Sequence, residues 1–455
     1  MGAYSLRLLY RCVVFLFWIM GAVAHSDDSI PITILHTNDL HSRFRSEKNL
    51  PKLGGIARLK TAIDRIRKSV PNTLLLDGGD WSEGTIYYTE NTGAESVRML
   101  DRLGYDAAVV GNHDWLNGPD VLLNSLVSTQ PNTTFLSANL DPNAYSRKEE
   151  FQKRILPYRI IPVGGAQVAI IGVSTYEKIY DVMFKPVRIL DPVTVVNGLA
   201  SDLKKKGLAD LVIVISHNAI PLNQKILTRA KDVDLLIGAH DHVKLTHPVV
   251  VKHLDGKTQW IVETGRWGEY LGRVDLSVKL KSPGNKSVQL QKYQLVQIDS
   301  RFPEDPDIVA SIEELESRIE HHYGPVFHQQ IAESEAEFVR EGNAGIGSLI
   351  TDAYLKFKPE ADFALEGNEF IYDGIHRGAI FTSDVFNSIP NIYNPKTGKT
   401  WTLRSFPIHG RKLKWVLYIF YCSGKIINFA GLSASGLEIS YRPVFQASSG
   451  PTIFF

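Results

Sequence analysis

Cysteine is scarce in this chain of 455 residues, which contains only Cys12 and Cys422. Cys12 lies in an expected leader segment, so the exported chain would keep one thiol and could form no internal disulfide. A disulfide scaffold is therefore excluded, and the hydrophobic core must stabilise the fold. With 44% hydrophobic and 22% charged residues, the composition is that of an ordinary globular protein, long enough for two cores.

An excess of charge of either sign is also absent, because 50 lysines and arginines face 49 aspartates and glutamates. A formal net charge of +1 gives no global field that would attract a polyanion or an acidic membrane surface. We therefore expect no nucleic-acid partner.

Long apolar runs are missing too, and the run nearest the start has the pattern of a signal peptide. Arg7 and Arg11 precede an apolar run over residues 13–21, which ends on Ala22-Val23-Ala24. This run is shorter than the about 20 apolar residues of a membrane-spanning helix. We expect residues 1–24 to be removed on export, which leaves a periplasmic or secreted protein without a stable membrane span. An uncleaved anchor is the alternative.

Five apolar segments share one design, a strand pattern that ends directly before polar residues able to bind metal. The segments begin at Ile32, Leu74, Ala107, Leu211 and Val233. Their continuous hydrophobicity is typical of strands that are covered on both faces of a sheet. In open α/β sheets, ligands bind just beyond the carboxyl ends of the strands. One pocket should then contain Asp39, His41, Asp80, Asn112, His217, His240 and His242.

The remaining chain predicts two domains and a connecting helix. Apolar residues recur at helical spacing between the strands, as in residues 55–69 and 96–103, so alternating βα units are expected. The predicted domains and their boundaries are a first domain over residues 30–300, a charged amphipathic linker helix within 303–325, and a second domain over 330–455.

The pattern of ligand types as a whole indicates a metal centre, although one Asp-x-His pair alone would not. A carboxylate such as that of Asp80 can bridge two cations, an arrangement typical of two-metal hydrolases. Imidazole and carboxylate ligands without a thiolate favour Zn, Mn, Co or Fe over Ca or Cu(I). Two divalent metal ions are therefore the predicted cofactors.

The surrounding motifs resemble those of known phosphoesterases. The resemblance to the calcineurin-like metallophosphoesterase superfamily is carried by Asp39-x-His41, Gly79-Asp80, Gly111-Asn112-His113-Asp114, Ser216-His217 and Gly238-x-His240-x-His242. Three longer segments further resemble the 5'-nucleotidase family: Thr33-Ile-Leu-His-Thr-Asn-Asp-Leu-His-Ser42, Gly54-Gly-Ile-Ala-Arg-Leu59 and Leu76-Asp-Gly-Gly-Asp80. The similarity covers roughly residues 30 to 280.

This resemblance implies an α/β fold, in which a four-layer αββα metallophosphoesterase sandwich precedes a smaller α+β C-terminal domain. It implies that Asp39, His41, Asp80 and His242 hold one metal, whereas Asp80, Asn112, His217 and His240 hold the other. It also implies that His113 is catalytic, contacting the phosphate and stabilising charge in the transition state. The implied substrate is a small-molecule nucleotide.

Three features depart from the family pattern. Leu116 stands where the family has an aspartate that orients the catalytic histidine, and such a loss could lower the rate about 10- to 100-fold. Residues 366–372 replace the glycine-rich phosphate loop and its arginine, for which Arg377 or Arg404 could substitute. Against the family pattern, we expect a shortened second domain without the region that supplies an aromatic wall for the base.

The resemblance favours dimetal-dependent hydrolysis of phosphate esters of extracytoplasmic nucleotides, with 5'-nucleotidase activity as the leading interpretation. A 2',3'-cyclic-nucleotide phosphodiesterase/3'-nucleotidase or a UDP-sugar hydrolase is the first alternative, because the altered loop is where selectivity would lie. A secreted nucleotide-binding protein with weak catalysis is the second, and it is motivated by Leu116 and the shortened domain.

Overall fold

The computed structural model describes residues 29–46, 48, 53–253, 255–280, 287–339, 345–390, 402–426, 431–437, 442–446 and 449–454. The predicted signal peptide over residues 1–24 lies outside the described residues. Within the described ranges, no helix is both long enough and apolar enough to cross a membrane.

A seven-stranded sheet contains the first three of the five strands that the sequence predicts. Its strand order is β15-β14-β1-β2-β3-β4-β6, in which β1, β2, β3, β4 and β6 pair in parallel and β14 and β15 are antiparallel to their neighbours. The strands are β1 (Ser29–Thr37), β2 (Thr73–Asp77), β3 (Ala107–Val109), β4 (Thr134–Leu136), β6 (Ile155–Leu156), β14 (Tyr270–Lys279) and β15 (Ser287–Gln297).

A six-stranded sheet contains the other two predicted strands. Its order is β12-β13-β11-β10-β8-β7, in which the four central strands are parallel and the two edge strands antiparallel. The strands are β7 (Tyr158–Val163), β8 (Ala166–Val173), β10 (Leu211–Ser216), β11 (Leu235–Gly238), β12 (Val249–Lys252) and β13 (Thr258–Val262).

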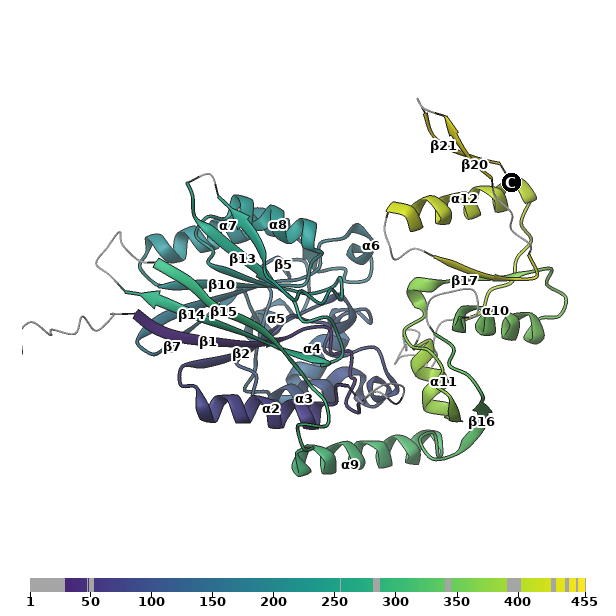
Figure 1. Ribbon diagram of the computed structural model, residues 1–455, viewed down its shortest axis with the longest axis horizontal. Coiled ribbons are helices and arrows are strands. Elements are labelled where there is room, and N and C mark those ends of the chain that lie inside the picture. Colours follow the sequence, from purple (N-terminus) through teal and green to yellow (C-terminus); the bar gives the residue numbers. More distant parts are fainter. Residues whose placement is uncertain are drawn as a thin grey trace, which may run out of the picture.

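The two sheets face each other, and helices cover both outer faces (Figure 1). Apolar side chains from both sheets, such as Ile34 and Ile213, fill the space between them. The outer helices are α2 (Ile56–Ser69), α3 (Ala94–Leu103) and α4 (Pro119–Thr129) on the first sheet, and α7 (Pro192–Lys205) and α8 (Ile220–Arg229) on the second. The predicted four-layer αββα sandwich is thereby confirmed.

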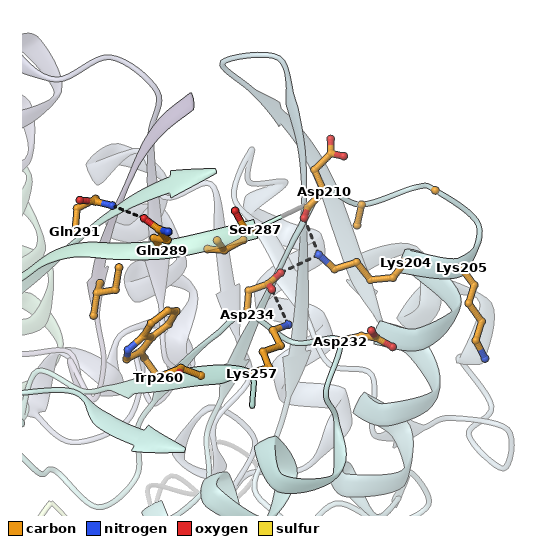
Figure 2. Close-up of a pocket in the computed structure, with 15 residues that line it drawn as sticks. Lys204, Lys205, Asp210, Asp232, Asp234, Lys257, Trp260, Ser287, Gln289 and Gln291 are labelled. Atoms are coloured by element: carbon orange, nitrogen blue, oxygen red, sulfur yellow. Dashed lines mark hydrogen bonds and ion pairs between the residues drawn. The ribbon is translucent and has the colours of Figure 1, made fainter. Parts of the chain in front are cut away.

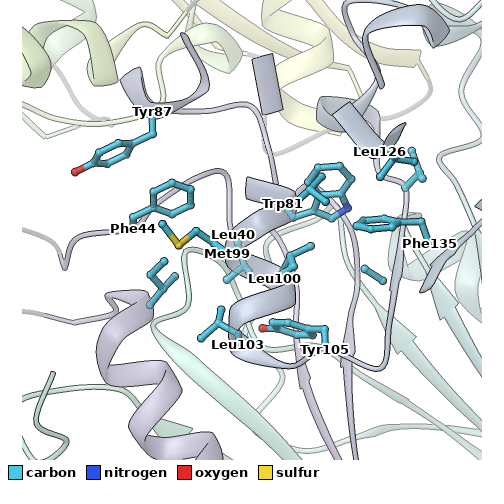
Figure 3. Close-up of a cluster of buried hydrophobic side chains, with 14 of the residues drawn as sticks. Leu40, Phe44, Trp81, Tyr87, Met99, Leu100, Leu103, Tyr105, Leu126 and Phe135 are labelled. Carbon is cyan, nitrogen blue, oxygen red and sulfur yellow. The ribbon is translucent and has the colours of Figure 1, made fainter. Parts of the chain in front are cut away.

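Trp81 anchors the loop that follows β2 in the outer core of the first sheet (Figure 3). Its ring packs edge-on against Phe135 at a centroid distance of 5.1 Å, and its Nε1 donates a hydrogen bond to the Val109 carbonyl at 3.1 Å. An indole buried with its N–H satisfied is a strong anchor. The polar residues on either side of Trp81 are therefore held in fixed positions.

Helix α9 (Pro306–Tyr323) connects the sandwich to the C-terminal domain. The Asp305 side chain caps its start by accepting the backbone N–H groups of Asp307 and Ile308, both at 3.1 Å. Its buried face, which includes Ile312 and Leu315, packs on the outer core of the first sheet. The linker helix is therefore fixed to the sandwich along its length.

The described residues of the C-terminal domain form short strand pairs, three α-helices and one 3-10 helix. Its elements are β16 (Gln330–Ser334), α10 (Ile346–Phe357), β17 (Ala364–Gly367), η4 (Asn368–Phe370), β18 (Gly378–Phe381), α11 (Thr382–Ser388), α12 (Gly410–Ile426), β19 (Leu432–Ser435), β20 (Arg442–Gln446) and β21 (Ser449–Phe454). The strands pair as β16 with β18, β17 with β19, and β20 with β21. This mixed second domain agrees with the α+β expectation.

The shorter elements of the sandwich lie in its loops. They are η1 (Ile86–Thr89), η2 (Asn91–Gly93), η3 (Asn112–Asp114), β5 (Leu140–Asp141), α5 (Lys148–Arg154), α6 (Lys178–Asp181) and β9 (Arg188–Ile189).

Polar contacts hold the C-terminal domain against the sandwich. Arg43 forms an ion pair with Asp373 at 2.6 Å, and the backbone N–H of Ile86 donates to Asn387 Oδ1 at 2.9 Å. A cavity of about 500 Å³ lies among these contacts. The loop that contains Asp373 therefore lies beside the loops that follow β1 and β2.

Gly172 in β8 allows a close approach of the two sheets, and this generates a stability prediction. A Cβ at Gly172 would lie 2.5 Å from Leu136 Cβ and 2.9 Å from the Leu136 carbonyl oxygen. We expect Gly172→Ala to lower the free energy of unfolding by about 1–3 kcal/mol, because the sheets would have to separate. Urea unfolding monitored by circular dichroism measures this change.

Gly198→Ala is the matched control, because Gly198 lies in α7 and a Cβ there would meet nothing within 4 Å. This variant should gain up to about 1 kcal/mol, because alanine restricts the unfolded chain and favours helix. Equal stabilisation of both variants would contradict the close contact at Gly172.

Candidate metal centre

The carboxyl ends of strands from both sheets converge on one group of polar side chains. The predicted ligands follow directly on β1, β2, β3, β10 and β11. Six of them form two compact groups, one of Asp39, His41 and His242 and one of Asp80, His217 and His240. Asn112, the seventh, adjoins His113, whose backbone N–H donates to Asp80 Oδ1 at 2.8 Å.

The first group brings two imidazoles and a carboxylate to one point. Its ligand atoms all lie within 4.8 Å of one another. His242 Nε2 lies 3.2 Å from His41 Nε2 and 3.3 Å from Asp39 Oδ1. His41 Nδ1 donates to the Glu83 carbonyl oxygen at 2.7 Å, so the lone pair of a neutral His41 is on Nε2. The lone pair on His41 Nε2 is therefore directed at the other members of the group and is available to bind a metal.

The second group has the same construction. His217 Nδ1 donates to the Gly78 carbonyl oxygen at 2.8 Å, which leaves Nε2 as the metal-binding nitrogen. His240 Nε2 donates to Glu177 Oε1 at 2.9 Å, so Nδ1 is the nitrogen available for a metal. Each of these histidines therefore has one nitrogen oriented by the protein and the other free to bind a cation.

The two groups are adjacent, because their carboxylates lie between the histidines. His41 Nε2 is 3.8 Å from Asp80 Oδ2, and His217 Nε2 is 3.8 Å from Asp39 Oδ1. Each carboxylate is therefore close to a histidine of the other group. This arrangement suits a bridging carboxylate between two cations.

The donor atoms of the two groups suit divalent ions, because hydrogen bonds among the residues leave some buried nitrogens unpaired. Asp39, Asp80 and His217 are 0%, 1% and 0% exposed. His217 Nε2 lies 3.0 Å from Asp80 Oδ2 but makes no hydrogen bond, and His242 Nδ1 is likewise buried without a hydrogen-bond partner. Buried polar atoms are normally satisfied, so the unpaired nitrogens of this cluster fit a role as ligands to a cation. Imidazole and carboxylate donors suit Zn, Mn, Co or Fe.

Backbone strain is concentrated on the same residues. Positive φ angles of 53°, 49°, 55°, 83° and 56° occur at Asp39, His41, Asp80, His240 and His242. A non-glycine residue in this region costs of order 1–3 kcal/mol and is maintained only where the surrounding structure enforces it. The chain accepts this cost at five predicted ligands, which supports a functional role for the cluster.

The electrostatics of the metal-free cluster show how strongly its charges interact. Burial favours the neutral form of Asp80, but the facing His217, His113 and His41 outweigh it and hold the pKa of Asp80 well below its usual range. Burial likewise lowers the pKa of His217, but Asp80 and Asp39 outweigh it and raise that pKa to about 10. A cation bound in this group would favour the neutral ring of His217, because a metal ligand must be deprotonated.

Two side chains that the sequence analysis did not single out contact His113. Glu83 places its carboxylate on His113 Nδ1, and the Tyr372 hydroxyl lies 2.8 Å from His113 Nε2. Burial lowers the pKa of His113, but the carboxylates of Asp80 and Glu83 raise it to about 9. Glu83 could have been suspected from its place three residues after Asp80, and Tyr372 from its place in the altered loop.

Neither Leu116 nor Asp114 orients His113. Leu116 is half-buried and has no polar group. Asp114 accepts the backbone N–H groups of Gly111, Asp80 and Ser82 at 2.7, 3.0 and 3.0 Å. Asp114 therefore braces the loop after β2, which it joins to the loop after β3.

The two predicted phosphate-binding arginines lie at the surface. Arg377 directly precedes β18 and Arg404 lies ahead of α12, and both side chains are exposed. Their contact with substrate stays a prediction. From the C-terminal domain, it is Tyr372 that contacts His113.

A cavity of about 1280 Å³ lies at the opposite ends of the strands (Figure 2). Its buried Asp234 precedes β11 and pairs with Lys204 at 2.9 Å and with Lys257 at 2.8 Å. The predicted metal ligands follow the carboxyl ends of the strands, whereas this cavity adjoins the amino ends. Its buried charge is already neutralised, so it does not compete with the metal centre as the functional site.

Comparison with known proteins agrees with the fold and with the site. The Calcineurin-like phosphoesterase family matches residues 32–244, a range that contains every predicted metal ligand. The sandwich with its two His/Asp groups is therefore a calcineurin-like metallophosphoesterase domain.

The relatives and solved structures that resemble this chain include several 5'-nucleotidases. The chain is 30% identical to a snake venom 5'-nucleotidase of Crotalus adamanteus over 77% of this chain and 62% of that protein. It is 28% identical to the 5'-nucleotidase of Homo sapiens over 71% of this chain and 59% of that protein. A 5'-nucleotidase precursor from Thermus thermophilus superimposes with a TM-score of 0.74 and 25% identity, over 92% of this chain and 83% of that chain.

The matched domain, residues 32–244, belongs to the calcineurin-like phosphoesterase family, and the chain is similar to 5'-nucleotidases over 71–77% of its length. The chain spans about 60% of the length of the curated relatives that it matches. A Haemophilus influenzae NAD nucleotidase, at 18% identity and a TM-score of 0.61, shares the fold.

The position of Asp80 generates a prediction about metal content. We expect Asp80→Ala to lower the bound metal from about two ions per chain to fewer than one, because a bridging carboxylate serves both cations. Atomic emission after reconstitution with Mn or Zn and desalting measures this. Asp202→Ala, at an exposed position of α7, is the control and should keep both ions. Two ions retained by Asp80→Ala would contradict the bridging role.

Proposed function

We propose that this protein hydrolyses phosphate esters of extracytoplasmic nucleotides, with a nucleoside 5'-monophosphate as the leading substrate. The observation that carries this proposal is the pair of adjacent His/Asp groups with His113 beside them. The predicted leader segment supports action outside the cytoplasm. Similarity to proteins named 5'-nucleotidases supports the substrate class.

The chain's own residues would prepare the site for this reaction. Asp39, His41, Asp80 and His242 would hold one ion, and Asp80, Asn112, His217 and His240 the other. When two divalent ions are bound, they supply Lewis-acid polarisation of the phosphoryl group and activation of the attacking water. Carbonyl oxygens fix the tautomers of His41 and His217 in advance, so these donors need no reorganisation.

His113 would act on the phosphoryl group itself. The Glu83 carboxylate contacts Nδ1, which leaves Nε2 as the nitrogen that would face the phosphoryl group and donate a hydrogen bond to it. A donor fixed in a buried site stabilises charge that develops in the transition state. The C-terminal domain would hold the nucleoside, and Arg377 and Arg404 remain candidates for contacts with the phosphate.

A second substrate class, a 2',3'-cyclic nucleotide, is favoured by the Tyr372 contact. Tyr372 ends the segment that replaces the family's arginine-bearing phosphate loop, and it offers His113 a neutral hydroxyl. A monoester dianion carries one more negative charge than a cyclic diester, so the loss of a cation penalises the monoester more. A UDP-sugar is a third candidate, and a nucleotide-binding protein with weak catalysis is the alternative outside the enzyme class.

Phosphate release by the metal-reconstituted protein tests the proposal. AMP, ATP, a UDP-sugar and 2',3'-cyclic AMP are compared in the presence of Mn or Zn, with metal content measured on the same sample. The 2',3'-cyclic AMP and the UDP-sugar are read by product chromatography, because neither ring opening nor cleavage of the diphosphate alone releases free phosphate. We expect AMP to be turned over by protein that holds about two ions per chain. Two bound ions without turnover of any substrate would instead support the binding protein.

Removal of His113 provides a test of the mechanism. We expect His113→Ala to lower kcat roughly 10²- to 10³-fold, because it deletes a fixed donor to the transition state. Metal content should not change, because His113 is not one of the proposed ligands. His247→Ala, which removes an exposed histidine, is the control and should leave kcat unaltered. Loss of metal from His113→Ala would contradict a role separate from the ligands.

A further inference from the structure

The imidazole of His113 needs a partner on Nδ1 if Nε2 is to face the substrate. A buried histidine that acts through one nitrogen is usually held in orientation by a hydrogen bond to the other. Leu116 follows three residues after His113, where the resemblance implies an aspartate for this purpose, and a leucine can accept no hydrogen bond. The chain must therefore supply the acceptor from elsewhere, or leave His113 unoriented.

Glu83 is in the right place to be that acceptor. It is 3% exposed, and its carboxylate contacts His113 Nδ1. Its backbone carbonyl accepts a hydrogen bond from His41 Nδ1 at 2.7 Å. One residue therefore orients both the proposed phosphate-binding histidine and a predicted metal ligand. The rings of His41 and His113 meet edge-on, with centroids 4.8 Å apart.

The loop that carries Glu83 is held in this position from several sides. Trp81 is buried in the outer core, and the Asp114 carboxylate accepts the Ser82 N–H at 3.0 Å. Gly84 follows with a φ of 150°, and a Cβ there would lie 2.6 Å from His41 Cβ. Only glycine fits at this point, so the close approach of Glu83 to both histidines is built into the loop.

We propose that Glu83 has taken over the role of the family's aspartate and is the positioning residue that directs His113 toward the phosphate. This inference rests on the proposed function. The orienting carboxylate of this chain then lies in the loop after β2, whereas Leu116, in the loop after β3, has no group that could serve.

Substitution with second-site rescue tests this positioning role. In Glu83→Gln we expect kcat for AMP to fall about 10- to 100-fold, with KM changed less than about threefold and metal content unchanged. Leu116→Asp alone should have little effect, because Nδ1 already has its partner. In the double variant, the aspartate should restore kcat at least about tenfold over Glu83→Gln.

Glu90→Gln is the matched control. Glu90 is also a buried glutamate that accepts a hydrogen bond from a histidine, here from His322 Nδ1 at 3.0 Å. His322 lies on α9, away from the metal centre. This variant should keep the wild-type kcat. Loss of metal from Glu83→Gln would overturn the proposal, because Glu83 would then act through the metal centre. A double variant that holds both ions yet stays as slow as Glu83→Gln would overturn the proposal that Glu83 serves in place of an aspartate at position 116.

A spectroscopic measurement decides the question independently of turnover. In the zinc-loaded protein, the Nδ1–H proton signal of His113 is assigned by its disappearance in His113→Ala. We expect this signal to move upfield in Glu83→Gln, because an amide is a weaker acceptor than a carboxylate, and to move back in the double variant. An unmoved signal would overturn the proposal. A wild-type protein that turns over no nucleotide would contradict the proposed function alone, while this signal would still decide the role of Glu83.

Discussion

The burial of two carboxylates, Asp39 and Asp80, is the constraint on which the rest of the site depends. An ion removed from water loses several kcal/mol of solvation unless other groups replace it. Here imidazoles approach both carboxylates, and backbone N–H groups of His113 and His240 donate to them. The backbone strain is found at the same place, because five of the predicted ligand residues have positive φ angles.

The loop after β2 connects the buried carboxylates to the hydrophobic core and to His113. It supplies Asp80 as a ligand, Trp81 as a core anchor and Glu83 as the partner of His113. Asp114 fastens this loop from the loop after β3. Burial favours the neutral form of Asp114 and raises its pKa well above the usual range, while Asp80 nearby acts in the same direction. The site therefore depends on buried polar groups that satisfy one another rather than on solvent.

The C-terminal domain contributes a side chain to the surroundings of His113. Tyr372 reaches His113 from this domain, and its ring lies edge-on to His41 at a centroid distance of 5.8 Å. The ion pair of Arg43 with Asp373 holds the adjacent residue to the loop after β1. Tyr372 belongs to residues 366–372, where the sequence predicts a departure from the family's phosphate loop, and this residue contacts the proposed phosphate-binding histidine.

The sequence by itself determined the strands, the identity of the candidate ligands and the class of fold. Continuous apolar runs that stop on aspartate or histidine are local patterns, and they needed no knowledge of the tertiary structure. Only the tertiary structure decided that the five strands divide between two facing sheets, and that Glu83 and Tyr372 both reach His113. Side-chain contacts between loops depend on the packing of whole layers and on backbone angles rarely adopted outside glycine, and no local pattern of residues encodes either.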